Sequence, residues 1–262
     1  MTAGWDTAIP ASRPDMSWDA SGIRPTIHPR VLPNVCGKPR PDCAELPIWS
    51  DPISPTIMEP REPTAPRTPQ EALRALIDGN ERYASGERRT VDYNRLGDRI
   101  AETQRPFAAI IACADSRVSV SAIFDLAPGH VFVSRVAGNS VDRAVLGSTE
   151  FAVAELGVQL VMVLGHGDCG AVKAAIAAAN GELSFPPEQF GAIGAVVDAV
   201  LGPVKALPPN ERTLECAISA NAAAHARRVA ATEPIIAPAV NAGRVSVVAA
   251  VYDIRTRRVS VL

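Results

Sequence analysis

The sequence predicts an α/β fold with a central, mostly parallel β-sheet, an antiparallel edge strand and flanking helices. Three strand-like runs, FAAIIA (107–112), HVFVSRV (130–136) and QLVMVLG (159–165), alternate with helix-length segments. Near-continuous apolar strands that alternate with helices are typical of parallel sheets covered on both faces. A fourth strand is expected at RVSVVAAVYDI (244–254), and RRVSVL (257–262) is expected to form the antiparallel edge strand.

The first helix is expected within TPQEALRALIDGNERYASGE. Thr68 can cap this helix, Pro69 fits its first turn, and Glu71 completes a capping box. An apolar stripe at helical spacing follows, made of Leu73, Leu76, Ile77 and Tyr83. Further helices are expected at about 91–104 and at 143–157, 170–179, 188–201 and 211–231.

Residues 1–67 differ in composition from the remainder of the chain. More than half of the 23 prolines lie at or before Pro69, and so do all three tryptophans. Because proline at this density blocks helices and sheet ladders, we expect a proline-rich, irregular N-terminal extension over 1–67 and one folded domain over 68–262. Met58 leads to the hypothesis that the upstream stretch is dispensable or an over-extended start.

Charge and hydropathy argue against several classes of partner. The net charge is −2 and no basic block occurs, so neither nucleic acid nor an anionic membrane is expected to bind. No apolar run reaches the ~18 residues that a membrane span needs. The N-terminus, MTAGWDTAIPASRPD, lacks the charged start and apolar middle of a secretory signal. The expected compartment is therefore the cytoplasm.

The five cysteines do not suggest a disulfide framework in a chain of 262 residues. In a reducing compartment, cysteines near histidine more often indicate a metal site or catalysis. Cys36 and Cys43 lie near His28, but their spacing fits no common zinc finger, and two unrelated thiols are the simpler interpretation. Cys216 is expected to be a buried thiol, and His225 is expected to be an exposed helical residue.

Metal-binding side chains follow two of the predicted strands. Cys113 ends the first run, and His166 and Cys169 follow the third. If these strands are neighbours, the three side chains converge at the carboxyl edge of the sheet, where function gathers in open parallel sheets. Two thiolates and one imidazole suit zinc, and three protein ligands leave a fourth position open, as in catalytic zinc sites.

Asp115 and Arg117 extend this predicted site. Asp115 lies two residues past Cys113, close enough to reach the metal and to compete with water for the open position. Arg117 can hold that carboxylate in a bidentate pair, so that it orients the attacking group instead. Because two thiolates neutralise Zn²⁺, the bound water should be less acidic than on three histidines, and activity should rise toward alkaline pH. A plain surface ion pair is the alternative.

The motif CADSR followed by GHGDCG resembles the signature of the β-class carbonic anhydrases, in which Cys-x-Asp-x-Arg precedes His-x-x-Cys. The likeness extends over about 69–262, through LIDGNERY, PGHVFVSRVAGN and VLGSTEFAV. The resemblance implies a homodimer or tetramer whose two N-terminal helices extend onto a partner subunit. It also implies Asp115 and Arg117 as the catalytic dyad and one Zn²⁺ per subunit, held by Cys113, His166 and Cys169.

The resemblance to the plant-type branch also implies residues that contact the substrate. Gln104 stands where that branch has a substrate-orienting glutamine, Phe132 where it has an aromatic wall for CO2, and Ala137 near its small apolar wall. Phe151 stands where many relatives place a tyrosine, so a hydroxyl is missing from the pocket. Ile110 replaces the tryptophan of the bicarbonate-inhibited branch, whose inhibitory site is therefore not expected. A helix end and a core position are the alternatives for Gln104 and Phe132.

The expected function is zinc-dependent reversible hydration of CO2 to bicarbonate and a proton, the activity of a carbonate dehydratase, which is a lyase. Hydrolysis of carbonyl sulfide or carbon disulfide at the same site is a second interpretation, because CO2 is isoelectronic with both. A non-enzymatic, zinc-stabilised scaffold is a third, although a structural site has no use for a restrained carboxylate such as Asp115. No side chain is an obvious proton shuttle, so turnover should depend on buffer concentration.

Overall fold

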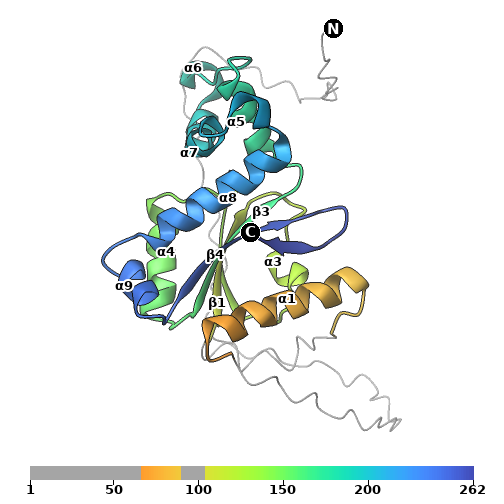
Figure 1. Cartoon of the computed structure of the whole chain (residues 1–262), viewed down its shortest axis with the longest axis vertical. Coiled ribbons are helices and arrows are strands. Elements are labelled where there is room, and N and C mark those ends of the chain that lie inside the picture. The colour runs from red at the N-terminus through yellow and green to blue at the C-terminus, as the bar shows by residue number, and fades with distance from the viewer. Residues whose placement is uncertain (1–65, 90–103) are drawn as a thin grey trace, which may run out of the picture. The chain divides into compact units, whose positions relative to one another are not determined.

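The computed structural model describes residues 66–89 and 104–262, which form a five-stranded β-sheet in the order β2-β1-β3-β4-β5 (Figure 1). The first four strands pair in parallel, and β5 pairs antiparallel with β4. This confirms the predicted α/β sheet with an antiparallel edge strand. The strands are β1 (Ala108–Cys113), β2 (Val131–Val136), β3 (Leu160–His166), β4 (Ser246–Tyr252) and β5 (Val259–Val261).

Helices cover both faces of this sheet. On one face, α1 (Pro69–Ser85) and the short α3 (Val120–Ile123) share a core with alternate residues of β1 and β3. On the other face, Ala109 and Ile111 of β1 and Val161 and Val163 of β3 share a core with α4 (Arg143–Ala154), α8 (Leu214–Ala230) and α9 (Ile236–Asn241). Every residue of β1 and β3 is buried, which is why both appear as continuous apolar runs in the sequence.

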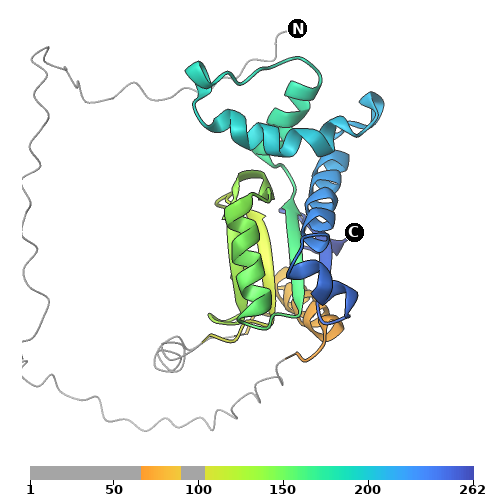
Figure 2. The same ribbon diagram turned by 90° about the vertical axis from the view of Figure 1, so that its left-hand side faces the viewer.

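Three further helices lie beyond the carboxyl ends of the strands (Figure 2). They are α5 (Gly170–Ala179), α6 (Pro187–Phe190) and α7 (Ile193–Lys205). Buried residues of α5, α7 and the start of α8 form a separate cluster that includes Cys113 and Cys169. The apolar packing at this end of the sheet therefore surrounds the side chains predicted to bind metal.

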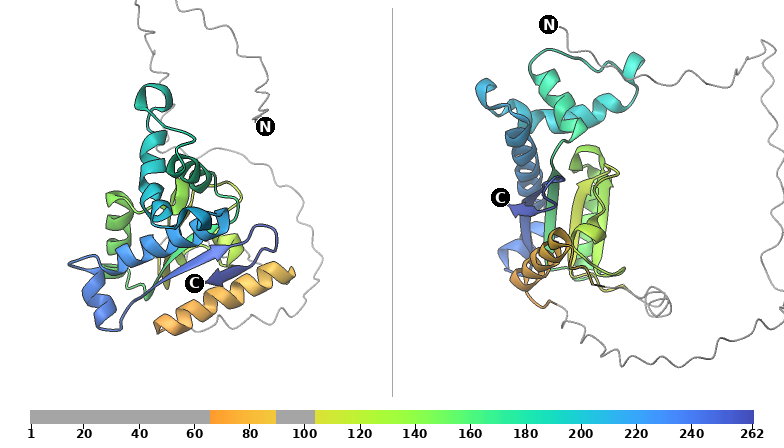
Figure 3. Two further views of the ribbon diagram at one scale, coloured as in Figure 1. Left: turned by 45° about the horizontal axis from the view of Figure 1, so that its top comes forward. Right: turned by 90° about the vertical axis from the view of Figure 1, so that its right-hand side faces the viewer.

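The N-terminal helix is capped close to the predicted pattern and packs beside the β4–β5 hairpin (Figure 3). The Glu71 N–H donates to the Thr68 hydroxyl, and the Glu71 carboxylate accepts from the Arg67 N–H. Buried Asn80 ties the helix to the hairpin, because its amide donates to the Arg257 carbonyl and accepts from the Val259 N–H. The expectations for residues 1–65, and nearly all of the helix expected at about 91–104, fall outside the described residues.

Some sequence expectations differ from the structure. The helix predicted over 188–201 divides at Gly191, whose φ of 55° interrupts α6 and α7, and α9 was not predicted. Two assignments on α8 were wrong: His225 is buried and Cys216 is exposed. The helix is rich in alanine, so the sequence pattern did not identify its buried face, which contains His225 one turn after Asn221.

Asp125 is buried beside three arginines that tie the N-terminal helix to the segment after α3. The nearest guanidinium nitrogens of Arg82, Arg89 and Arg88 lie 2.7, 3.3 and 3.8 Å from its carboxylate. Burial by itself would raise the pKa of Asp125, but hydrogen bonds from Arg82 and Arg89 offset this, so the pKa lies below its usual value. The charge of Asp125 therefore stabilises the folded state near neutral pH.

We expect Asp125→Asn to lower the free energy of unfolding by about 1–3 kcal/mol at pH 7, the penalty for a buried group that loses its partners. The cost stays below that of splitting a fully buried ion pair because Arg88 and Arg89 are half exposed. A carboxylate whose pKa is lowered by folding stabilises the folded state at pH values above its unfolded-state pKa. This stabilisation is lost as the pH falls through the folded-state pKa. Urea denaturation should therefore show the two proteins converging below about pH 4.

Asp78→Asn is the matched control, because Asp78 is an exposed aspartate of α1 with a 3.9 Å contact to exposed Arg74. This variant should unfold like the wild type at every pH. If the two variants lost the same free energy of unfolding, the arginine cluster around Asp125 would make no specific contribution to stability.

Candidate metal centre

Cys113, His166 and Cys169 converge at the carboxyl end of the sheet. Cys113 is the last residue of β1, His166 is the last residue of β3, and Cys169 caps the start of α5. Because β1 and β3 are adjacent and parallel, their ends meet, and the potential ligand atoms of the three residues lie within 4.8 Å of one another. The convergence expected from neighbouring strands is therefore present.

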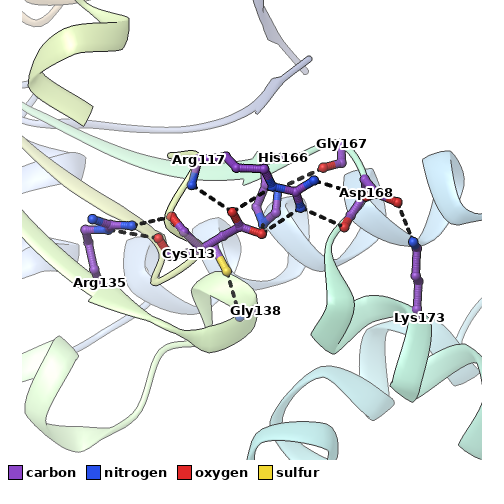
Figure 4. Close-up of polar contacts among 9 residues, drawn as sticks. Cys113, Arg117, Arg135, Gly138, His166, Gly167, Asp168 and Lys173 are labelled. Atoms are coloured by element: carbon purple, nitrogen blue, oxygen red, sulfur yellow. Dashed lines mark hydrogen bonds and ion pairs between the residues drawn. The ribbon is translucent and has the colours of Figure 1, made fainter. Parts of the chain in front are cut away.

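The orientation of His166 fits a metal ligand. Its Nδ1 lies 2.8 Å from the Gly167 carbonyl oxygen, which can only accept, so Nδ1 carries the proton (Figure 4). In the neutral imidazole Nε2 is then the unprotonated nitrogen, and it is buried without a hydrogen-bond partner in the described part of the chain. A buried nitrogen lone pair beside two sulfurs is the arrangement that a cation satisfies.

The two sulfurs differ in their proton affinity. The pKa of Cys113 lies well below its usual value, chiefly because Cys169 donates a hydrogen bond to its sulfur. The pKa of Cys169 is raised, because ionisation would remove that donor and burial disfavours a second negative charge. Cys113 and Cys169 are 5% and 1% exposed, so a cation at this site is shielded from bulk water on the sulfur side. Two thiolates and an imidazole are donors that zinc prefers.

Asp115 and Arg117 form the predicted ion pair at the edge of this cluster. The guanidinium donates from Nε to Oδ1 at 2.9 Å and from Nη2 to Oδ2 at 2.8 Å, and the Arg117 N–H also donates to Oδ1. These hydrogen bonds hold the pKa of Asp115 well below its usual range. Oδ2 lies 4.0 Å from His166 Nε2, so the carboxylate stands beside the metal-binding atoms while Arg117 restrains it.

Three residues that the sequence reasoning did not select also support the site. Arg135 donates to the carbonyls of Cys113 and Asp115, and the Gly138 N–H donates to the Cys113 sulfur at 3.3 Å. Asp168 accepts from Arg117 Nη1 at 3.2 Å and from Lys173, so charges of alternating sign run along the edge (Figure 4). The position of Asp168 inside GHGDCG was the one sequence signal that could have indicated it.

The residues implied for the substrate pocket lie in different places. Ala137 is exposed and directly precedes Gly138, and Gln104 is exposed before β1. Phe132 and Phe151 form an aromatic pair with ring centroids 6.2 Å apart. Phe132 lies opposite Ala109, four residues before the end of the strand pair, which is about 13 Å at the usual rise per residue. Within one chain, the fold does not bring this pair to the metal-binding cluster.

The fold and the cluster together define a domain suited to hold a metal ion at the carboxyl end of a parallel sheet. The sequence profile of the carbonic anhydrase family matches residues 108–259, more than half of the chain. The chain therefore belongs to the carbonic anhydrase family, and its sequence and structure are similar to those of the β-class.

Curated relatives agree with this assignment. Carbonic anhydrase 2 of Mycobacterium tuberculosis is 50% identical over 116 residues, which cover 43% of this chain and 55% of that protein. A carbonic anhydrase of Pseudomonas aeruginosa is 32% identical over 197 residues, which cover 72% of this chain and 87% of that protein. The first of these matches thus spans about half the length of its relative.

Solved structures show the same fold. The Coccomyxa β-carbonic anhydrase in complex with acetazolamide superposes with a TM-score of 0.55 at 27% identity, covering 72% of this chain and 86% of that chain. The β-carbonic anhydrase CcaA has a TM-score of 0.56 at 23% identity, and the match covers 72% of this chain and 94% of that chain. No helix in residues 66–89 and 104–262 combines the length and apolar character that crossing a bilayer requires.

Proposed function

We propose that this protein catalyses the reversible hydration of CO2 to bicarbonate and a proton at one Zn²⁺ per subunit. The observation that carries the proposal is the buried cluster of two sulfurs and an unpartnered imidazole nitrogen beside a restrained carboxylate. The residues proposed as zinc ligands are Cys113, His166 and Cys169. Family membership supports the same chemistry.

Each residue of the site has a defined task in this proposal. When bound, zinc is a Lewis acid that makes water more acidic and so a better nucleophile at neutral pH. Arg117 engages both oxygens of Asp115, which keeps this carboxylate from closing the cluster. Oδ2 of Asp115 retains a further lone pair, which accepts a hydrogen bond from the attacking water and orients it. The proton leaves to buffer.

The aromatic pair suggests that the substrate pocket includes a partner subunit. Phe151 is 46% exposed, and its neighbour Phe132 lies on β2, the edge strand of the sheet. If these residues serve in the CO2 pocket with Gln104 and Ala137, as in the plant-type branch, they must face the cluster of another chain. We therefore propose that the protein is a homodimer or tetramer, which light scattering would test. We also propose that it resides in the cytoplasm, as expected from the sequence, which cell fractionation would test.

The proposed function is tested by metal analysis coupled to stopped-flow CO2 hydration between about pH 6.5 and 9. We expect close to one zinc per chain, a rate that rises toward alkaline pH, and turnover that increases with buffer concentration. Removing zinc with a chelator should abolish activity, and adding Zn²⁺ should restore it. Zinc without hydration, together with sulfide release from carbonyl sulfide or carbon disulfide, would favour the second reaction. Zinc with neither activity would indicate a scaffold.

A further inference from the structure

Asn221 lies in the middle of α8, remote in sequence from every residue of the metal-binding cluster. Its side chain is fully buried, and its amide Nδ2 donates a 2.9 Å hydrogen bond to the Gly138 carbonyl. Its Oδ1 is also buried and has no partner among the described residues. A buried polar group that makes only part of its hydrogen bonds costs about 1–3 kcal/mol, so fold stability alone does not account for an asparagine here.

Gly138, the partner of Asn221, lies directly behind the cluster. Its φ of 71° belongs to the left-handed region, and a Cβ at this position would come within 2.8 Å of Val200 Cγ2 and 3.1 Å of Ala171 Cβ. The position therefore requires glycine, whose backbone is the least restrained by its own sterics. The Gly138 N–H donates to the Cys113 sulfur at 3.3 Å, so the conformation of this residue decides where that donor points.

We propose that Asn221 is a positioning residue that fixes Gly138, so that its N–H stays directed at the Cys113 sulfur. The inference rests on the proposed zinc site. A donor aimed at a ligand sulfur fixes the orientation of that sulfur, and losing a partner that orients a ligand typically weakens metal binding by about 10- to 100-fold. A helix on the face of the sheet thereby controls how firmly the cluster retains its ion.

The test compares zinc retention in Asn221→Ala and Asn221→Leu with the wild type. Alanine suits the alanine-rich helix, and leucine keeps the branched shape of the side chain, at a larger volume, while removing the donor. The zinc-loaded proteins are mixed with excess chelator, and the release rate is measured without reference to activity. We expect zinc release about 10- to 100-fold faster in both variants. After cobalt substitution, the sulfur-to-cobalt charge-transfer band should also shift.

Val229→Ala is the matched control, because Val229 is a fully buried residue of the same helix that packs in the core beneath the sheet. This variant loses stability without touching Gly138, so it should release zinc at the wild-type rate. The inference is overturned if an Asn221 variant that folds releases zinc at the wild-type rate. That result would leave the proposed function intact. A wild-type protein that holds no zinc would instead refute the proposed function.

Discussion

Cys113→Ala and His166→Ala are each expected to lose zinc and CO2 hydration together. Each substitution removes one of three candidate ligands, and the two that remain cannot surround an ion. The loss of metal affinity should exceed the ~10- to 100-fold that removing a ligand's hydrogen-bond partner costs. We expect a large loss of zinc affinity in His166→Ala, because His166 is 0% exposed and alanine offers no metal-binding atom in its place.

Zinc content after dialysis and the stopped-flow rate are the measurements for these two variants. Cys216→Ala is the matched control, since Cys216 is an exposed thiol on α8 outside the cluster. It should retain one zinc per chain and the wild-type rate. Far-ultraviolet circular dichroism verifies that each variant is folded. A folded His166→Ala protein with full zinc and full activity would exclude the proposed ligand set.

Asp115→Ala is expected to keep zinc and to lose most of its turnover. The carboxylate is held by Arg117, and Asp115 is not among the described residues whose ligand atoms converge within 4.8 Å of one another, which are Cys113, His166 and Cys169. Orientation and proton-transfer effects of such a group are worth about 10²- to 10⁴-fold in rate. The loss should persist from about pH 6.5 to 9, because the lowered pKa of Asp115 keeps it ionised throughout.

Metal analysis and rate measurements on Asp115→Ala separate its possible roles. Asp198→Ala, which alters an exposed aspartate of α7, serves as the control and should match the wild type in both. Full activity of Asp115→Ala across this pH range would contradict the orienting role. Loss of zinc along with activity would show that Asp115 acts as a ligand instead.

The sheet could be predicted because its information is local. Strands β1 and β3 are buried at every position, and each ends at a residue that binds metals well. Parallel strands end at the same edge, so the proximity of Cys113 and His166 followed once the two strands were assumed to be neighbours. The sequence analysis could only assume that these two strands are adjacent, and the structure shows it through the strand order β2-β1-β3-β4-β5.

Helix faces were harder to predict than strands. In α8 the alanines obscure the apolar stripe, so nothing in the local pattern separates buried His225 from exposed Cys216. Burial there is decided by β4, β3 and α7, which pack on the helix from other parts of the chain. Gly191 likewise appeared compatible with a continuous helix, and its positive φ is a feature of the fold alone.

The sequence by itself determined the chemical identity of the candidate site: two thiols, one imidazole, and an acid spaced two residues from an arginine. These are properties of side chains and of short spacings along strands and a helix start. The tertiary structure alone decided which groups restrain them, such as Asn221 acting on Gly138 from 83 positions away and Arg135 on Cys113 from 22. Such contacts arise from how the layers pack, and packing depends on the whole core rather than on any local pattern.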